Sequence, residues 1–407
     1  MRPGRPRVCE PSRGRWVRFG WSSVLMRYFV KAVADRIGRR RPPGDPDAHL
    51  LGAIDWICRA HDASADDGVP HSYDLKEGSW LPSYPETTGY IIPTLFDVAR
   101  VFGKPDLAER ALRMARWEAS IQMPDGGIQA GVVGADPLVP TIFNTGQVLF
   151  GLTRAWKESG DEALREAAHA AARWLVQAQD PDGCWRRFPS PFTTTEVGTY
   201  NTRSAFALAR AAETLDEAAY LEAAVRNVDW AVSQSGANGW LPGNCLSQHA
   251  DDRALTHTLA YAIRGIFEVG AAAGRKDLVA RGVELAASTA RLQRVDGSLP
   301  GYVSPAWRPL ARWSCVTGNA QMALNWARIA HLTGDSQPLE WARKANAFNM
   351  SVQDLRSDDQ GVLGGIPGSF PFDGEYMTWR FPNWAAKFFV DALLIQREGE
   401  KAGIVGA

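Results

Sequence analysis

The sequence predicts an all-α toroid, a ring of about six helix hairpins, and two series of repeated residues support this prediction. In the first series a glutamine is followed shortly by an Asp-Gly or Asn-Gly turn, and successive glutamines are 57, 55, 59 and 60 residues apart. In the second series a polar helix start recurs at intervals of 57, 57 and 56 residues. Two offset series with one period are typical of a chain in which every repeat contributes two helices.

The glutamine series marks the ends of the outer helices. The stretches 107–121 and 163–178 are rich in alanine and place apolar residues at helical spacing. Each stretch stops near an Asp-Gly turn, where glycine accepts the backbone conformation that ends a helix. The glutamines of this series are Gln122, Gln179, Gln234, Gln293 and Gln353.

The second series marks the starts of the inner helices. Residues 144–146 (Asn-Thr-Gly) and 257–259 (His-Thr-Leu) open stretches of apolar and small residues. Asparagine and threonine side chains can accept hydrogen bonds from the free N–H groups of a first helical turn. The other members begin at Thr87, Asn201, Val316 and Asn383. Six inner helices are therefore predicted.

The lengths of the links between helices orient the ring. The links from an inner to an outer helix are tight, as at 102–105, 159–161 and 333–335. The links from an outer to an inner helix run about 15 to 25 residues, which is long for such connections. The long links therefore gather on one face, where they meet the positive ends of six helix dipoles. We expect a concave, polar pit with aromatic walls on this face.

The predicted organisation is an arm, a toroid and a tail. The chain has 407 residues, of which 45% are hydrophobic and 16 are tryptophan, so it can build a large core. Residues 1–44 are interpreted as a basic, disordered arm, because eleven arginines fall among the first 41 residues. Residues 45–396 form the toroid, and residues 397–407 form a short tail.

The N-terminal region contains an amphipathic segment that starts at Met26. Either Met1 or Met26 can be the first residue of the translated chain. Arg18, Arg27 and Lys31 interrupt the apolar stretch here, so we expect neither a signal peptide nor stable membrane insertion. A basic amphipathic segment does suit a weak peripheral contact with anionic lipid.

Charge and cysteine content exclude several functions. Lys plus Arg and Asp plus Glu both total 45, so the chain has no overall basic field for a nucleic acid. The five cysteines are far apart and form no C-x-x-C pair, which argues against a disulfide framework and a zinc site. We expect a cytoplasmic protein without metal or cofactor, and its oligomeric state is not indicated.

With these repeats in place, residues 45–395 resemble the six-hairpin (α/α)6 toroid superfamily, which includes glycoside hydrolases, polysaccharide lyases and sugar epimerases. The stretches 256–261, 317–321 and 381–389 are similar to those of uncharacterised proteins associated with bacterial polysaccharide biosynthesis. The resemblance implies a carbohydrate substrate and a place in exopolysaccharide biosynthesis.

The repeated Gln, Asp-Gly and Trp turns also resemble those of terpene cyclases and protein prenyltransferase β-subunits, which are α/α toroids as well. The chain lacks their D-x-D-D acid and D-D-x-x-D metal-diphosphate motifs. Only adjacent aspartate pairs occur, at 251–252 and 358–359. An isoprenoid cyclase is therefore an alternative that the sequence disfavours.

Two carboxylates are candidate catalytic groups. Glu86 precedes the first inner helix, and its aromatic neighbours would raise its pKa by desolvation. Glu375 lies in the last long link, which ring closure places beside the first hairpin. Glycoside hydrolysis uses such a pair of carboxyl groups, so hydrolysis is the favoured reaction. The structural alternatives are a helix-capping charge for Glu86 and a solvated loop side chain for Glu375.

A second set of residues suits proton abstraction from carbon. His257, at the start of the fourth inner helix, can move a proton near neutral pH. Tyr200, Asn201 and Arg203 lie together at the third inner helix, after Glu196. Lyase and epimerase chemistry at a uronate needs an acid, a base and a group that masks the carboxylate charge. The alternative is a cluster of helix caps and ion pairs.

Polar and aromatic residues in the long links and at the helix starts are expected to bind the substrate, because indole and phenol faces stack on sugar rings. Core packing is the alternative role for each aromatic residue. The predicted substrate-binding residues are Asn144, Asn201, Arg203, Trp313, Tyr376, Trp379 and Asn383. A non-catalytic glycan-binding or scaffolding toroid of a polysaccharide assembly system is the alternative from another functional class.

Overall fold

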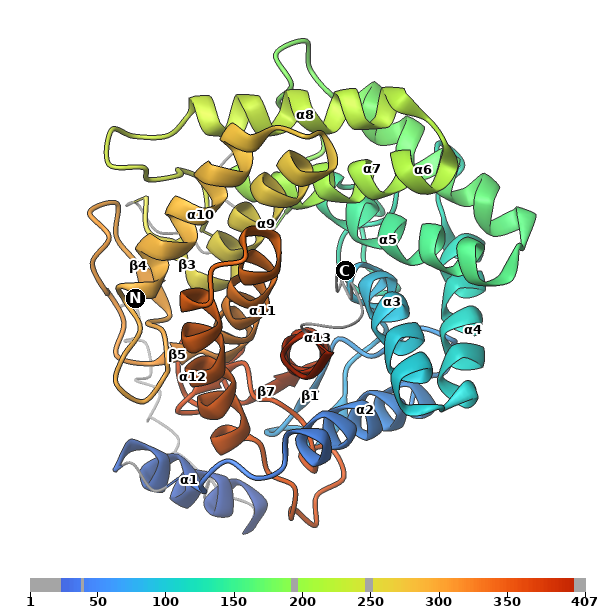
Figure 1. The fold of residues 1–407 in the computed structure, drawn as a ribbon. Coiled ribbons are helices and arrows are strands. Elements are labelled where there is room, and N and C mark those ends of the chain that lie inside the picture. The colour runs from blue at the N-terminus through green and yellow to red at the C-terminus, as the bar shows by residue number, and fades with distance from the viewer. Residues whose placement is uncertain (1–22, 38–39, 192–196, 246–251, 399–407) are drawn as a thin grey trace, which may run out of the picture.

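The computed structural model describes residues 23–37, 40–191, 197–245 and 252–398. Twelve of the α-helices in these ranges form two concentric rings (Figure 1). The outer ring comprises α2 (Pro46–Asp62), α4 (Pro105–Ile121), α6 (Glu162–Ala178), α8 (Ala218–Ser233), α10 (Lys276–Ala290) and α12 (Gln337–Val352). The inner ring comprises α3 (Pro85–Phe102), α5 (Ile142–Ser159), α7 (Thr202–Leu215), α9 (Thr256–Ala272), α11 (Val316–Thr333) and α13 (Asn383–Glu398). The predicted all-α toroid of six hairpins is confirmed.

The ring closes where the end of the toroid meets its beginning. Helix α13 packs against α2 and α3 as well as against α11 and α12. In the links, β1 (Ser72–Asp74) pairs with both β2 (Ser79–Trp80) and β7 (Arg380–Pro382). Two smaller sheets pair β3 (Ala254–Leu255) with β4 (Tyr302–Val303), and β5 (Ser314–Cys315) with β6 (Ser369–Phe370). The β1–β7 pair joins the first and last links, and the two smaller sheets join successive links.

In several repeats the glutamine connects one outer helix to the next. The amide of Gln179 donates to the carbonyl oxygen of Gly183 in its own turn (3.1 Å) and to that of Ala223 in α8 (2.9 Å). Gln122 and Gln293 make the same pair of hydrogen bonds in their repeats. A residue type that satisfies two carbonyl groups at once explains why glutamine recurs at this position.

The threonine and glycine at the inner-helix starts have separate roles. Thr145 Oγ1 accepts a hydrogen bond from the backbone N–H of Ile128 (2.9 Å), which holds the preceding link against the helix. Glycine allows neighbouring inner helices to approach closely: a Cβ added to Gly89 would lie 2.5 Å from the Cα of Val148. Where the second repeat series carries a glycine, as at Gly89, Gly146 and Gly318, it marks a close contact between inner helices.

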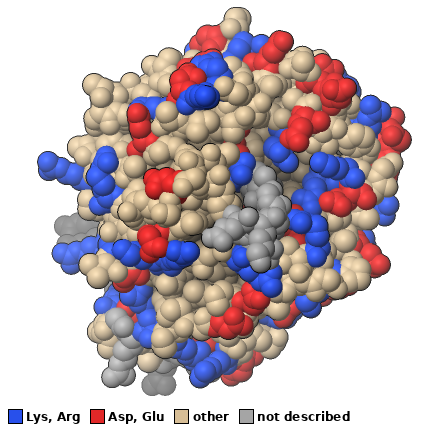
Figure 2. All heavy atoms as spheres, in the orientation of Figure 1, with Lys and Arg blue, Asp and Glu red and all other residues tan. Residues whose placement is uncertain are grey.

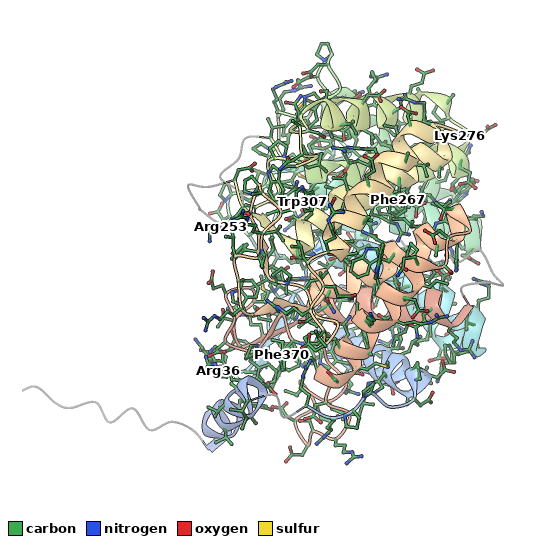
Figure 3. All side chains as sticks on the ribbon, turned by 60° about the vertical axis from the view of Figure 1, so that its left-hand side comes forward. Arg36, Arg253, Phe267, Lys276, Trp307 and Phe370 are labelled. Atoms are coloured by element: carbon green, nitrogen blue, oxygen red, sulfur yellow. The ribbon has the colours of Figure 1, made fainter. Side chains whose placement is uncertain are left out.

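The two ends of the ring differ. At one end, α3, α5 and α11 stop at Gly103, Gly160 and Gly334, all in the left-handed conformation, and tight turns follow. The long links lie at the other end, which we call the pit face. Figure 3 shows Arg253 and Trp307 of these links on one side of the molecule and Lys276, at the start of α10, on the other. The pit-face links are residues 63–84, 122–141, 179–201, 234–255, 291–315 and 353–382.

Buried ion pairs lie within the inner helices. Within α13, Lys387 Nζ lies 2.5 Å from Asp391 Oδ2, and Thr94 of α3 donates to the same carboxylate (2.7 Å). Within α9, Arg264 Nε lies 2.8 Å from Glu268 Oε1. These side chains are almost fully buried, so each charge depends on its partner for stabilisation.

On the molecular face shown in Figure 2, acidic and basic side chains are interspersed.

Helix α1 (Ser23–Arg36) lies outside the ring and contacts the pit-face links. Tyr28 donates to Asp359 (2.8 Å), and Arg40, shortly after the helix, pairs with Asp296 (2.7 Å). Residues 1–22 of the expected arm and residues 399–407 of the expected tail lie outside the described part, so the division into arm, toroid and tail stays a prediction. Within the described part, no helix is both long enough and apolar enough to cross a membrane.

Candidate active site

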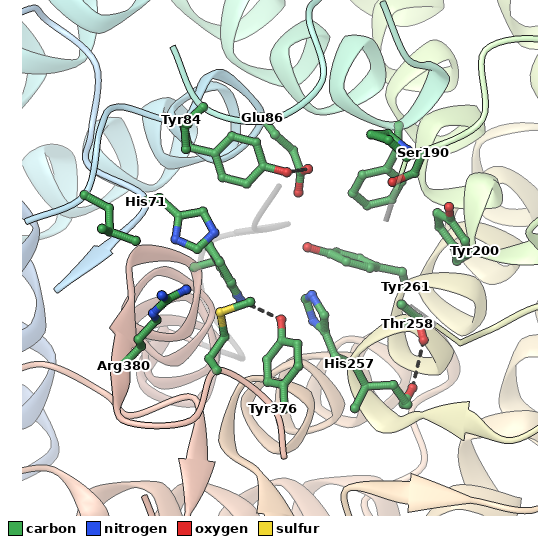
Figure 4. Close-up of a pocket in the computed structure, with 18 of the residues that line it drawn as sticks. His71, Tyr84, Glu86, Ser190, Tyr200, His257, Thr258, Tyr261, Tyr376 and Arg380 are labelled. Atoms are coloured by element: carbon green, nitrogen blue, oxygen red, sulfur yellow. Dashed lines mark hydrogen bonds between the residues drawn. The ribbon is translucent and has the colours of Figure 1, made fainter. Parts of the chain in front are cut away.

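A cavity of about 960 Å³ opens on the pit face. It is bounded by the long links and by the first turns of inner helices, and its size is at the upper end for small-molecule sites. The charged and imidazole side chains in its lining are two carboxylates, two histidines and one arginine. Its principal lining residues are His71, Tyr84, Glu86, Tyr200, His257, Tyr261, Glu375, Tyr376, Arg380 and Trp384 (Figure 4).

Glu86 is the second residue of α3, directly after the proline that starts the helix. Its carboxylate accepts a hydrogen bond of 2.5 Å from the Tyr84 hydroxyl, and both groups face the cavity (Figure 4). Burial raises the pKa of Glu86 to about 7, although the hydrogen bond from Tyr84 opposes that rise. Since a large fraction of this carboxyl group is protonated at neutral pH, Glu86 can donate a proton inside the pit.

His257 is the second residue of α9 and reaches the pit as a neutral imidazole. Its Nδ1 lies 2.8 Å from Gln321 Oε1 of α11. An amide oxygen only accepts, so Nδ1 carries the proton and Nε2 keeps its lone pair. Burial lowers the pKa of His257 to about 4; the Gln321 hydrogen bond opposes this shift, and the nearby Arg203 adds to it. His257 can therefore accept a proton through Nε2.

His71 and Arg380 are lining residues that the sequence analysis missed. His71 Nδ1 is hydrogen-bonded to the hydroxyl of Ser72 (2.9 Å), and burial lowers the pKa of His71 to about 3. Arg380 Nε donates to Asp74 Oδ2 (2.9 Å), which orients the guanidinium at the cavity. Both residues lie in the strand-paired first and last links, and neither belongs to a repeat that could have revealed it.

Three aromatic side chains form a wall beside the histidines. Trp384 Nε1 donates to the Tyr376 hydroxyl (2.8 Å). The centroids of the Tyr261 and His257 rings are 4.7 Å apart. Burial raises the pKa of both tyrosines above the ordinary range. Their hydroxyls therefore stay protonated, and their rings offer flat apolar surfaces of the kind that sugars stack on.

Five of the residues predicted from sequence line this one cavity. They come from the first, third, fourth and last long links or the helix starts that follow. Glu375 is exposed to solvent, in contrast to the half-buried Glu86. Tyr200 lies in a 3-10 turn, and the centroid of its ring lies 5.3 Å from that of the Phe143 ring. The five are Glu86, Tyr200, His257, Glu375 and Tyr376.

The predicted asparagines are buried beside the cavity rather than in its lining. Asn144 Nδ2 donates to the carbonyl oxygen of Gln129 (2.7 Å), and Asn383 Nδ2 donates to that of Pro70 (2.9 Å). Asn144 therefore holds a long link against the helix that follows it, whereas Asn383 holds the first long link against α13 at ring closure. Asn201 is also buried at the start of α7. Substrate binding by these three residues stays a prediction.

The remaining predicted residues also lie outside the lining. Arg203 is buried, with its guanidinium 5.5 Å from the centroid of the Tyr261 ring, so one aromatic ring separates it from the cavity. Trp313 and Trp379 are partly exposed in the fifth and sixth long links. Glu196 lies outside the described residues. Direct contact of Arg203, Trp313 or Trp379 with a substrate stays a prediction.

Metal and disulfide chemistry can be assessed for the described residues. Among them, no group of three or more His, Cys, Asp or Glu side chains is arranged to hold a metal ion. The cysteines that the structure describes form no disulfide, and they are Cys58, Cys184, Cys245 and Cys315.

The fold and the pit define the protein as an (α/α)6 toroid with a candidate acid–base site. Similar solved structures include an unsaturated glucuronyl hydrolase from Bacillus sp. GL1, with a TM-score of 0.70 and 16% identity over 89% of this chain and 98% of that chain. A cellobiose 2-epimerase from Bacillus thermoamylovorans B4167 has a TM-score of 0.66 and 10% identity over 90% of this chain and 99% of that chain. A polysaccharide lyase has a TM-score of 0.61 and 12% identity over 88% of this chain and 99% of that chain.

These similarities confirm the predicted resemblance to the superfamily at the level of fold. Identities of 10 to 16% establish a common architecture and leave the reaction open. No protein-family model matches the chain, and no curated protein matches it in sequence.

Proposed function

We propose that this protein is a carbohydrate-active enzyme that hydrolyses a glycosidic bond of an anionic polysaccharide or oligosaccharide. The observation that carries the proposal is Glu86, a carboxylic acid with a pKa of about 7 that shares the pit with Glu375. Glycoside hydrolysis generally uses two carboxyl groups, one to protonate the leaving oxygen and one to activate water or attack the sugar. Glu86 is the acid in this proposal, and Glu375 is its partner.

The proposed reaction uses the contacts of Glu86. Glu86 gives its proton to the glycosidic oxygen as the bond from that oxygen to the anomeric carbon breaks. A water molecule attacks this carbon and loses a proton to Glu375. The Tyr84 hydroxyl, already 2.5 Å from Glu86, donates to the carboxylate that forms, and this hydrogen bond strengthens as charge develops.

Arg380 supports the choice of an anionic substrate. It is the only lysine or arginine among the described residues that line the cavity. Asp74 accepts a hydrogen bond from Nε of Arg380, so the other two guanidinium nitrogens can bind a carboxylate of the substrate.

The similar structures are consistent with this substrate class. One unsaturated glucuronyl hydrolase is described as specific for heparin, and another as responsible for the degradation of glycosaminoglycan. Exopolysaccharide biosynthesis as the biological context and a cytoplasmic location remain predictions from sequence.

The test is turnover of anionic glycans by Glu86→Gln. Glutamine retains the size of the side chain but has no carboxyl proton to donate. We expect turnover to fall by about 10²- to 10⁴-fold while glycan binding persists. Glu77→Gln is the matched control, because Glu77 is exposed in the link that precedes Glu86 and lies outside the cavity, and it should keep full activity. Retained turnover in Glu86→Gln would contradict the proposal.

The two histidines favour a second candidate, epimerisation or elimination at a uronate. His71 and His257 are both neutral, and each has Nδ1 in a hydrogen bond, so each can present Nε2 to a carbon-bound proton. This reaction incorporates solvent deuterium at carbon in an epimerised product, or yields an unsaturated sugar, whereas hydrolysis incorporates solvent ¹⁸O. Tight glycan binding without any turnover would instead identify a glycan-binding toroid.

A further inference from the structure

The exposed apolar side chains of this protein are concentrated on one side of the molecule. All eight large hydrophobic residues that are strongly exposed in the described part lie in or next to α1 or in the pit-face links. None lies in the tight turns at the opposite end of the ring. They are Val30, Val33, Ile37, Val133, Leu138, Val139, Val295 and Leu310.

Helix α1 presents an apolar stripe to solvent. Val30, Val33 and Ile37 are 60%, 41% and 67% exposed, and their spacing of three and four residues puts them on one side of the helix. Tyr28 and Ala32 are buried instead. Helix α1 therefore packs on the toroid through one apolar side and leaves a second apolar side uncovered.

The link 291–315 extends this surface. Val295 is fully exposed and Leu310 is 46% exposed. Asp296 is the only acidic residue of the link, and its pairing with Arg40 ties the link to the end of α1. The link also carries three exposed arginines, Arg291, Arg308 and Arg312. We call residues 23–37, which comprise α1 and Ile37, together with residues 291–312 the docking patch.

Positive charge distinguishes the docking patch from the other exposed apolar residues. The link 122–141 carries Val133, Leu138 and Val139, but it contains two aspartates and no lysine or arginine. The chain that leads into α1, residues 1–22, contains six arginines and one acidic residue. Among the exposed apolar residues of the described part, those of the docking patch are therefore the ones accompanied by basic charge.

We propose that the docking patch binds the surface of an anionic membrane. Its apolar side chains would lie among the lipid headgroups, while its arginines pair with lipid phosphates. Such a contact needs no membrane-crossing helix, and the described part contains none. Because the docking patch and the cavity share the pit face, binding would hold the pit close to the headgroups. The inference does not depend on the reaction in the pit.

The experiment is sedimentation of the full chain with lipid vesicles. We expect binding to vesicles of phosphatidylcholine with phosphatidylserine, and little binding to phosphatidylcholine alone. The bound fraction should fall when the salt concentration rises from about 0.1 M to about 0.5 M, because salt screens the attraction between arginines and headgroups.

Two variants of the docking patch test its chemistry. We expect Val30→Ser, Val33→Ser and Ile37→Ser together to weaken partitioning by about tenfold or more. Arg308→Gln with Arg312→Gln should weaken it by about tenfold as well. The matched control replaces Val133, Leu138 and Val139 by serine and should bind like the unchanged protein. Circular dichroism verifies that each variant is folded.

Several outcomes would overturn the proposal. One is equal binding to both kinds of vesicle, and another is no binding to either. A third is an equal loss in the control variant. Dimerisation that the α1 variant abolishes, in a protein that does not bind anionic vesicles, would identify a second copy of the chain as the occupant instead.

Discussion

Burial, rather than a charged neighbour, sets the protonation of the candidate catalytic residues. Glu86 has its pKa raised to about 7 by desolvation, and His257 has its pKa lowered to about 4 mainly by the same effect. Desolvation disfavours whichever form is charged, so the carboxyl group and the imidazole are both shifted toward neutrality. The pit can therefore hold an acid and a base that are both uncharged near pH 7.

This shift predicts a pH dependence of stability. The folded-state pKa of Glu86 exceeds the ordinary value of 4.5, so the folded protein retains a proton that the unfolded chain releases. As the pH rises from about 4.5 to about 7, the free energy of unfolding should therefore fall, and Glu86 should account for about 1 to 3 kcal/mol of this loss. Glu86→Gln should lack this loss, so the variant should gain stability relative to the unchanged protein as pH rises. Urea denaturation across this pH range measures the difference. Parallel curves for the two proteins would show that Glu86 is not desolvated.

The position of Arg380 in the cavity predicts that its replacement affects the KM for charged substrates more than that for neutral ones. We expect Arg380→Gln to raise the KM for an anionic glycan by about 10- to 100-fold, since a charge-assisted hydrogen bond is lost. A neutral glycan of the same length should be affected little. Arg187→Gln removes an exposed arginine from another pit-face link outside the cavity and serves as the control. Equal effects on charged and neutral glycans would exclude Arg380 as the carboxylate partner.

At the scale of elements, the repeat residues were visible in the sequence because each performs one local task in several repeats. The glutamine connects neighbouring outer helices, and the glycine after the threonine allows inner helices to approach. Residues without a repeated task gave no such signal. Arg380 lies in β7 and His71 directly precedes β1; these two strands pair only at ring closure, and for this reason both residues escaped sequence analysis.

The role of the repeat glutamine predicts that two glutamines at the end of α6 contribute differently to the stability of the protein. Gln179→Ala removes the amide that donates to the carbonyl groups of Gly183 and Ala223; Gly183 keeps its hydrogen bond from Asn227, so the free energy of unfolding should fall by about 1 to 2 kcal/mol. Gln177→Ala, two residues earlier and exposed, should change it by less than about 0.5 kcal/mol. Chemical denaturation compares the two. Similar values for both variants would show that the glutamine repeat is not a structural link.

At the scale of the whole molecule, buried carboxylates link neighbouring inner helices: Asp391 of α13 accepts a hydrogen bond from Thr94 of α3, and Glu268 of α9 pairs with Arg328 of α11. Lys387→Met should cost about 3 to 5 kcal/mol, because it leaves the buried carboxylate of Asp391 without its charged partner. Adding Asp391→Leu should recover much of that loss, since no uncompensated charge then remains. Thermal and urea denaturation of both variants test this. A double variant that is as unstable as Lys387→Met would argue against charge burial as the cause.

Local sequence determined the number of hairpins, the order of inner and outer helices, and the face that carries the long links. These features depend on helical periodicity, caps and turns, all of which act within one repeat. Sequence also placed Glu86 and His257 correctly at the mouths of inner helices, because position in the repeat decides where a helix start lies.

Tertiary structure alone decided which side chains share the cavity. Arg380 and Asp74 are hydrogen-bonded although 306 positions separate them, and their contact exists only because the ring closes. The pKa values of Glu86 and His257 are likewise properties of the closed ring, since desolvation depends on protein that several hairpins supply. A repeat specifies its own helices, whereas the chemistry of the pit requires all six repeats to meet.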